Sequence, residues 1–412
     1  MSPRTRALFL ALLLLLTAVP DTMAVPVLRE LLVERYGVRP QGAQVFMAIN
    51  LVGAAAAVPL LIWARPRFSA VGLLVAASLA DTALLLLLAA PVGFTASLVL
   101  RAMEGVTDVM VFAMLFDIVR RASGTHAARG MGMASTPLLL GLGAGAVLGG
   151  VAAGRMEGDA NQVAYAVFGA SAAFSGLVAL LAAVAWGPLS RLGPEAPPVE
   201  PASPAAAGAL GDRPRPLAWS CAMAFSDRAT GGLITGTLPL VLAQVLGYTR
   251  QERGWLLGLP LLLMAVGTGP AGALCDRWGS LRLRLVAGLL YAGAFAAIPL
   301  AGSAHGWLAV VMVAVGLSGS VMFASSLALA AQAGRGAVGL GAFRASGDLG
   351  FFAGTTLSIV MLSAGDEAEP TFAQYARVIV VFALGHAAIT ATLAALAWRQ
   401  RLAGRAAARA LR

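Results

Sequence analysis

The sequence contains no lysine, only two cysteines and three histidines, and only 12% of its 412 residues are charged. Soluble domains carry about 25% charged and 45–50% apolar residues. In contrast, 59% of this chain is hydrophobic, and its mean hydropathy is +0.83. So few polar residues could not cover the surface of an ordinary soluble enzyme. The composition therefore predicts an all-α protein that crosses a membrane several times.

The scarcity of cysteine and histidine excludes further classes of protein. Cys221 and Cys275 lie in or beside apolar segments and provide neither a disulfide framework nor a metal cluster. His126, His305 and His386 are too scattered along the chain for a metal site. The sequence has no nucleophile elbow, Walker-type phosphate loop or HExxH motif. We therefore expect no enzyme, no metal and no cofactor, and the nucleotide-binding domain of an ATP-driven pump is missing.

Apolar segments of about 20 residues, the length needed to cross a bilayer, recur twelve times along the chain. They lie near residues 7–28, 43–63, 69–90, 96–118, 131–154, 163–187, 217–245, 254–274, 285–303, 307–332, 338–364 and 374–398. The organisation that follows is a six-helix bundle over 1–187, a Pro/Ala-rich linker over 188–216, a second six-helix bundle over 217–398 and an Arg-rich tail over 399–412.

The first apolar segment also has the features of a signal peptide, with a basic start and small residues near Ala24. Cleavage there would leave eleven helices and move the C-terminus to the other side of the membrane. The apolar stretch continues through Val25, Val27 and Leu28. We therefore expect an uncleaved first helix.

The net charge of +10 admits two explanations, which predict different positions for the basic residues. Nucleic-acid binding would gather them in a patch, whereas a membrane protein collects them in its cytoplasmic loops. With both termini placed in the cytoplasm, most of the 29 arginines fall on that side. We therefore expect a multi-pass protein of the cell (inner) membrane with both termini cytoplasmic, and no nucleic-acid partner.

The two halves of the chain share weak internal similarity. Residues 104–113, EGVTDVMVFA, align with 315–324, VGLSGSVMFA, and place Thr107 opposite Ser318. Asp21 and Asp227 each lie midway along the first helix of their half. Duplication of a six-helix unit is a common origin of transporters whose site lies between the two repeats.

The clearest motif begins at Gly272 and reads G-A-L-C-D-R-W-G-S-L-R-L-R. It resembles the G-x-L-x-D-R-x-G-R-(K/R) loop of the major facilitator superfamily of secondary transporters, with Ser280 at the first basic position. A glycine at the start allows close helix approach, and a later one makes the turn. In the family this cytoplasmic loop is a conformational latch, and the resemblance implies that role for Gly272, Asp276, Arg277, Gly279 and Arg282. An ordinary Arg-rich loop would explain the arginines but not the spacing.

The corresponding loop of the first half, ARPRFS at 64–69, departs from the family pattern. It keeps Arg65 and Arg67 but has neither the aspartate nor the glycine. Asp117, near the inner end of its helix, is a candidate partner for these arginines.

The segment from Arg101 reads R-A-M-E-G-V-T-D and is similar to the family's R-x-x-Q-G signature, with Glu104 replacing Gln. Arg101, Glu104 and Asp108 are spaced i, i+3, i+7 and share one helix face. A charge at the bilayer centre costs about 2.5–3.5 kcal/mol on insertion scales. Two interpretations stay open: a pair that only fixes helix packing, or a polar face that reaches the transport pathway, which we favour.

The segment from Gly141 reads G-L-G-A-G-A-V-L-G-G and resembles the G-x-x-x-G-P-x-x-G-G motif of the antiporter branch, with Ala146 replacing Pro. Glycines repeated every four residues form a smooth stripe that a neighbouring backbone can approach closely. The packing or gating positions are Gly141, Gly145, Gly149 and Gly150.

The first helix carries D-T-M-A-V-P-V-L from Asp21 and looks like the opening helix of drug-efflux members. Pro26 can bend this helix near its outer end. Buried carboxylates in general have raised pKa values and can exchange protons near neutral pH, as proton coupling requires.

Other charges within apolar segments belong to no motif. Asp227 is followed directly by Arg228, and Arg344 lies four residues before Asp348. Each pair either neutralises itself or contributes to a proton relay, and we favour self-neutralisation. Asp81 lies midway along a helix that is peripheral in this family, so a cavity role is not expected.

Together these features predict a major facilitator with twelve helices that exports a small, fairly apolar molecule in exchange for protons. Asp21 would carry the proton, Arg101 and Glu104 would modulate it, and Asp227 and Asp348 would be secondary polar groups. An uptake symporter or uniporter for a metabolite is the first alternative, and a non-transporting sensor of the same fold is the second. The expected partners are the substrate, the proton and the lipid bilayer, and we expect a monomer.

Overall fold

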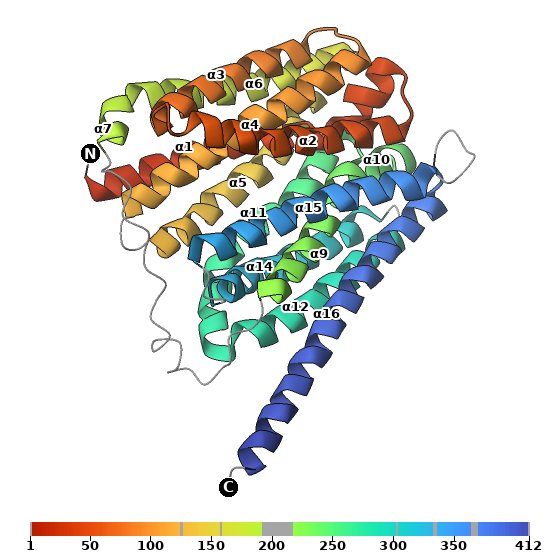
Figure 1. Cartoon of the computed structure of the whole chain (residues 1–412). Coiled ribbons are helices and arrows are strands. Elements are labelled where there is room, and N and C mark those ends of the chain that lie inside the picture. Colours follow the sequence, from red (N-terminus) through yellow and green to blue (C-terminus); the bar gives the residue numbers. More distant parts are fainter. Residues whose placement is uncertain are drawn as a thin grey trace. The chain divides into compact units, whose positions relative to one another are not determined.

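The computed structural model describes residues 2–123, 127–156, 159–191, 217–301, 304–332, 336–363 and 370–410. Within these ranges the regular secondary structure is helical, without strands (Figure 1). Most of the expected linker at 188–216 and the last two residues of the expected tail at 399–412 lie outside the described residues. The final helix continues through the rest of that tail to Ala410.

Each of the twelve predicted apolar segments coincides with one helix or with consecutive short helices. The first half contains α1 (Pro3–Met23), η1 (Val25–Val27), η2 (Arg29–Glu34), α2 (Pro40–Ala64), α3 (Ala70–Ala89), α4 (Phe94–Ser123), α5 (Ala127–Gly154), α6 (Ala160–Val184) and α7 (Trp186–Ser190). The second half contains α9 (Leu217–Gly236), α10 (Leu238–Leu240), η5 (Val241–Val245), α11 (Arg250–Trp278), α12 (Ser280–Ala296), α13 (Ile298–Ala301), α14 (His305–Gln332), α15 (Gly336–Ser363) and α16 (Phe372–Ala410).

Nine helices of the described chain are long and apolar enough to cross a membrane. The three other long helices are α4, α9 and α12. The first two carry charged residues within their apolar sequence, and α12 has only 17 residues. The fold is therefore an all-α polytopic membrane fold, as predicted.

Local signals in the sequence determine where several helices begin. The Ser69 hydroxyl accepts a hydrogen bond from the Gly72 amide at the start of α3, and Asp159 caps α6 in the same way. The turn between α11 and α12 contains Gly279 at φ 85°, a backbone conformation that favours glycine. Its position in the loop motif predicts this turn.

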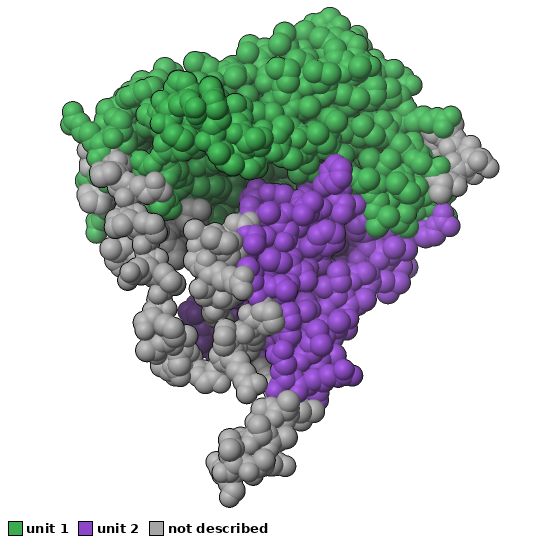
Figure 2. Space-filling view, in the orientation of Figure 1, with its two compact units in different colours: residues 1–199, 234–266, 355–375 green, residues 200–233, 267–354, 376–412 purple. Residues whose placement is uncertain are grey.

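The contacts divide the chain into two compact units, coloured separately in Figure 2. Unit 1 comprises residues 1–199, 234–266 and 355–375, and unit 2 comprises 200–233, 267–354 and 376–412. The division crosses the sequence halves, because parts of α9, α11 and α15 belong to unit 1. Unit 1 thus contains contacts between the two halves of the sequence. The division into bundles over 1–187 and 217–398 stays a prediction.

The glycine stripe of α5 packs directly against α1 in unit 1. A Cβ atom added at Gly141, Gly145 or Gly149 would lie 2.0–2.3 Å from a backbone oxygen of α1. Real Cβ atoms do not approach other atoms so closely. The two backbones therefore meet at these positions, as the four-residue spacing predicts.

Candidate functional site

Three charged residues of α4 lie on one face, and two of them form a buried ion pair. The Arg101 guanidinium donates to the Glu104 carboxylate over 2.7 Å, and both side chains are buried. Arg101 also lies 5.3 Å from the ring centroid of Phe46 on α2, a favourable cation–π distance. The predicted pair is therefore present, and its charge is compensated locally.

Gly105, the glycine of the same motif, explains how α2 reaches this pair. A Cβ at Gly105 would lie 2.1 Å from the backbone oxygen of Asn50, so the helices touch there. The Asn50 amide donates to Glu104 over 2.6 Å. Glu104 thus accepts from two donors on two helices.

Asp81 of α3 joins this group, although the sequence analysis did not expect a role for it. Its carboxylate accepts hydrogen bonds from Thr107 over 3.0 Å and from Ser175 over 2.5 Å. The side chain is buried and interacts electrostatically with Glu104. The family resemblance places this helix at the periphery of the bundle, but Asp81 lies on the side of α3 that faces α4 and α6. The hydroxyls of Thr107 and Ser175 are the only signal in the sequence that could have indicated this.

Asp21 of α1 completes the group. Its carboxyl group is hydrogen-bonded to that of Asp108 and interacts with Arg101 and Glu104. Asp21 and Asp108 are half-buried, whereas Glu104 and Arg101 are buried. Two carboxyl groups can share a hydrogen bond only when one of them holds a proton. We call Asp21, Asp81, Glu104 and Asp108, with Arg101, the carboxylate cluster.

The described residues contain no group of histidine, cysteine and acidic side chains arranged to hold a metal ion. Four carboxyl groups share one guanidinium, which leaves an excess of negative charge unless protons neutralise part of it.

Unit 2 contains a second buried polar group, centred on Asp227 of α9. Asp227 forms an ion pair with Arg284 of α12, whose guanidinium also donates to Ser326 of α14 over 2.8 Å. His386 of α16 bonds Ser226 through Nδ1 over 2.9 Å, and its Nε2 lies 3.9 Å from Asp227. Arg284 is the last residue of the loop motif that begins at Gly272, and His386 belongs to no motif. Neither was predicted to pair with Asp227.

The second polar group mirrors the carboxylate cluster in helix order. With Ser175, which donates to Asp81, the cluster joins the first, third, fourth and sixth long helices of the first half. The Asp227 group joins α9, α12, α14 and α16, the helices at the same places in the second half. This correspondence agrees with the predicted duplication.

The structure corrects the expected pairing of Asp227 with Arg228. Arg228 instead lies 3.5 Å from Asp348, which also bonds Arg344 over 3.2 Å, as the four-residue spacing predicts. Adjacent residues on a helix point about 100° apart and do not face each other, which explains the error. The side chains of Arg228, Arg344 and Asp348 are all exposed by 40% or more, so these pairs contribute little to stability.

The two candidate loops behave differently. In the first half, Arg65 pairs with Asp117 over 2.9 Å, as expected, and Arg67 stacks on the Trp63 ring instead. In the second half, Asp276, Arg277 and Arg282 are exposed and have no ion pair with a described residue. A Cβ at Gly272 would meet no atom of the described residues within 4 Å, so no described helix makes the close approach expected there. The latch role of this loop stays a prediction.

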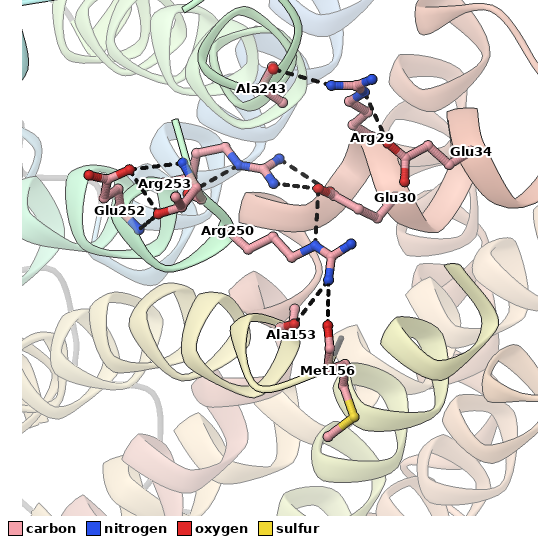
Figure 3. Close-up of polar contacts among 10 residues, drawn as sticks. Arg29, Glu30, Glu34, Ala153, Met156, Ala243, Arg250, Glu252 and Arg253 are labelled. Carbon is pink, nitrogen blue, oxygen red and sulfur yellow. Dashed lines mark hydrogen bonds and ion pairs between the residues drawn. The ribbon is translucent and has the colours of Figure 1, made fainter. Parts of the chain in front are cut away.

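A further ion-pair network of unit 1 joins the two halves of the sequence, and Figure 3 shows it. Glu30 of η2 is buried and accepts from Arg253 of α11 over 2.5 and 3.2 Å. Arg250 lies 3.4 Å from the same carboxylate and donates to the Met156 oxygen over 2.8 Å. We call Glu30, Arg250 and Arg253 the Glu30 clamp. A cavity of about 600 Å³ adjoins it, lined also by Arg29, Gly154 and Tyr248.

Glycines bring α5 and α11 together beside the Glu30 clamp. A Cβ at Gly150 would lie 2.6 Å from the Arg250 oxygen, and one at Gly258 would lie 2.6 Å from the Gly143 oxygen. Gly150 of the predicted motif therefore contacts the second half of the sequence, whereas the other motif glycines contact α1. Sequence reasoning missed Glu30, because it treated the arginines here only as loop charges.

Comparisons with known proteins agree with this fold. A model of the Major Facilitator Superfamily matches residues 10–355 and, in a second match, 220–409. A bacterial homolog to the human lysosomal transporter Spinster, solved in an inward-facing and unoccupied conformation, has a TM-score of 0.72 at 17% identity, over 95% of this chain and 96% of that one. A D-xylose–proton symporter has a TM-score of 0.68 at 14% identity, over 92% and 96%. A comparison with curated proteins found no match.

The structural similarities are too remote in sequence to show more than the fold, but the family match covers most of the chain. The helices, the buried intramembrane charges and this match lead to one conclusion: the chain belongs to the Major Facilitator Superfamily and is a multi-pass membrane transporter, not an enzyme.

Proposed function

We propose that this transporter is a proton-coupled exporter of a small, fairly apolar molecule and works by alternating access in the inner membrane, with both termini cytoplasmic. The carboxylate cluster is the observation that carries the proposal. It places four carboxyl groups and one guanidinium on three helices of unit 1, α1, α3 and α4.

The charge balance of the cluster favours proton binding. Arg101 compensates Glu104, and Asp81 is held by two hydroxyl donors. Asp21 and Asp108 are hydrogen-bonded to each other and are the less buried members of the cluster. These two groups are therefore the proposed exchange site, and the other members set its electrostatic environment.

Two features support export of an apolar cargo. The glycines of α5 resemble the antiporter motif, and they lie in close backbone contacts with α1 and α11. The core helices are dominated by Ala, Gly, Leu and Val, whereas sugar carriers commonly use amide and aromatic side chains. Arg228 and Arg344 both pair with Asp348, so neither guanidinium is without a carboxylate partner.

The Glu30 clamp is the proposed latch on the side opposite the termini. It ties η2, in the first half of the sequence, to the start of α11, in the second half. Alternating access requires contacts between the halves to break on one side in each cycle. A buried carboxylate between two guanidiniums is suited to breaking and re-forming in each cycle. Its ion pairs are strong while water is excluded, and water can hydrate the separated charges when the site opens.

Proton movement in proteoliposomes tests the proposal. The protein is reconstituted with a pH-sensitive dye inside, and ethidium, xylose, uridine and dialanine are supplied separately as probes. We expect ethidium to drive movement of protons opposite to its own, above the level of protein-free liposomes. Protons that move with xylose, uridine or dialanine would instead indicate an uptake symporter. Probe movement without proton movement would indicate a uniporter, and no movement of any probe in an intact protein would favour the sensor.

The variant Glu30→Gln tests the latch. Arg253 is only 2% exposed and loses its charged partner, so the closed arrangement loses about 1.5–3 kcal/mol. Since 1.4 kcal/mol is a factor of ten, a maleimide that cannot cross the membrane should label Gly154→Cys, in the wall of the adjoining cavity, at least about tenfold faster. The labelling is measured in a background protein that carries Cys221→Ser and Cys275→Ala, so that the introduced cysteine is the only thiol.

The matched control is Glu34→Gln. Glu34 pairs with Arg29 at a site where both side chains are 39% exposed, and such pairs contribute about 0–1 kcal/mol. Its labelling rate should therefore stay within about fivefold of the background protein. A Glu30→Gln rate no higher than that of Glu34→Gln would show that the clamp is not a latch.

A further inference from the structure

Unit 2 has an apolar groove between α12 and α14, which pack side by side. Its volume is about 640 Å³. The wall consists of leucine, valine, alanine and glycine apart from one serine. That serine, Ser318, donates its hydroxyl to backbone oxygens of its own helix. The groove therefore offers no free polar group to a ligand.

The protein itself leaves this groove empty. A Cβ at Gly293 would meet no atom within 4 Å in the part of the chain that the structure describes. Val286, Leu289, Leu290 and Leu317 are large, apolar and at least half exposed around it. The lining on α12 runs from Leu283 to Ala294, which is about 16 Å of helix. This is half of the roughly 30 Å hydrocarbon thickness of a bilayer, or one leaflet.

One end of the groove carries charge. Arg282 lies on the same face of α12 as Val286, Leu289 and Gly293, at spacings of four, seven and eleven residues. It is exposed and has no ion pair with any residue that the structure describes. Trp278 lies at the same end and is 64% exposed, as tryptophans at a membrane–water interface commonly are.

We propose that this groove binds an anionic phospholipid, with an acyl chain along Gly293 and the headgroup phosphate at Arg282. A one-leaflet apolar channel that ends at an exposed arginine and a tryptophan matches the chemistry of such a lipid. A second copy of the chain fits less well. In a dimer with its twofold axis along the membrane normal, the two Arg282 side chains would lie at the same depth and repel each other.

Native mass spectrometry of the whole protein tests this proposal. The delipidated protein is titrated with phosphatidylglycerol or with phosphatidylcholine of identical acyl chains, and the first dissociation constant is measured. We expect about fivefold tighter binding of phosphatidylglycerol, the ratio that corresponds to about 1 kcal/mol per arginine near a membrane surface. In Arg282→Gln the two lipids should bind equally.

Filling the groove tests the other half of the proposal. Gly293→Leu places a side chain in the empty space and should weaken both lipids at least threefold. The control Gly385→Leu lies on α16, is exposed and also has nothing within 4 Å, and it should bind as the wild type does. Val286→Trp fills the same groove if Gly293→Leu does not fold.

Three results would overturn the proposal. They are equal affinities of the wild type for the two lipids, unchanged binding in both groove-filling variants, and a wild-type dimer that Gly293→Leu dissociates. The last result would identify a second copy of the chain as the occupant.

Discussion

In the variant Asp21→Asn, the proton movement linked to transport should fall to the level of protein-free liposomes, while the same probe should still move down its own gradient. Asn keeps the shape and the hydrogen-bonding capacity of Asp but cannot take up a proton. Asp108 then loses the carboxyl group to which it is hydrogen-bonded. The half-buried pair Asp21 and Asp108 is the proposed exchange site, so either substitution should separate transport from coupling.

The control for this experiment is Asp159→Asn. Asp159 caps the start of α6, 16 residues before Ser175 of the cluster's surroundings, and Asn caps helices about as well as Asp does. Coupling should therefore be unchanged in this variant. Normal coupling in Asp21→Asn would contradict the role proposed for Asp21, and normal coupling in Asp108→Asn as well would contradict the role of the pair.

The variant Asp227→Asn should be the least stable of those considered. Arg284 is only 1% exposed and pairs with Asp227. Breaking a buried ion pair by removing one partner costs about 3–5 kcal/mol, because it leaves a buried charge without compensation. Thermal unfolding of the purified protein, followed by the loss of helical circular dichroism, should shift clearly to lower temperature.

The double variant Asp227→Asn/Arg284→Met tests the physical reason. It removes the uncompensated charge, so most of the stability should return. The matched control is Asp348→Asn, since Asp348 forms only exposed pairs and its loss should cost no more than about 1 kcal/mol. If Asp227→Asn were as mild as Asp348→Asn, the buried pair would not hold unit 2 together. Coupled transport that stays absent in the stable double variant would assign Asp227 a part in the pathway.

Features that depend on neighbouring positions in one helix could be predicted from the sequence. The twelve apolar segments, the Arg101–Glu104 pair and the stripe from Gly141 to Gly149 all follow from helix periodicity within a few turns. The Arg344–Asp348 pair follows for the same reason.

Features that join distant segments could not be predicted in this way. Glu30 and Arg253 are 223 residues apart, and Asp81 and Ser175 are 94 residues apart. The residues themselves carry no sign of which helix will lie opposite. Arg284 ends the loop motif that begins at Gly272, where an exposed charge is expected, yet its side chain is buried in unit 2 and pairs with Asp227. A single sequence shows which residues are polar within the membrane but not how they pair.

Proton uptake by the purified protein is the most direct test of the proposed function, because it needs no knowledge of the substrate. The wild type and Asp21→Asn are titrated from alkaline to acidic pH, and the protons bound per molecule are counted. If the carboxylate cluster exchanges protons at Asp21, the wild type should bind more protons than the variant over this range. Equal uptake by the two proteins would contradict proton coupling at Asp21.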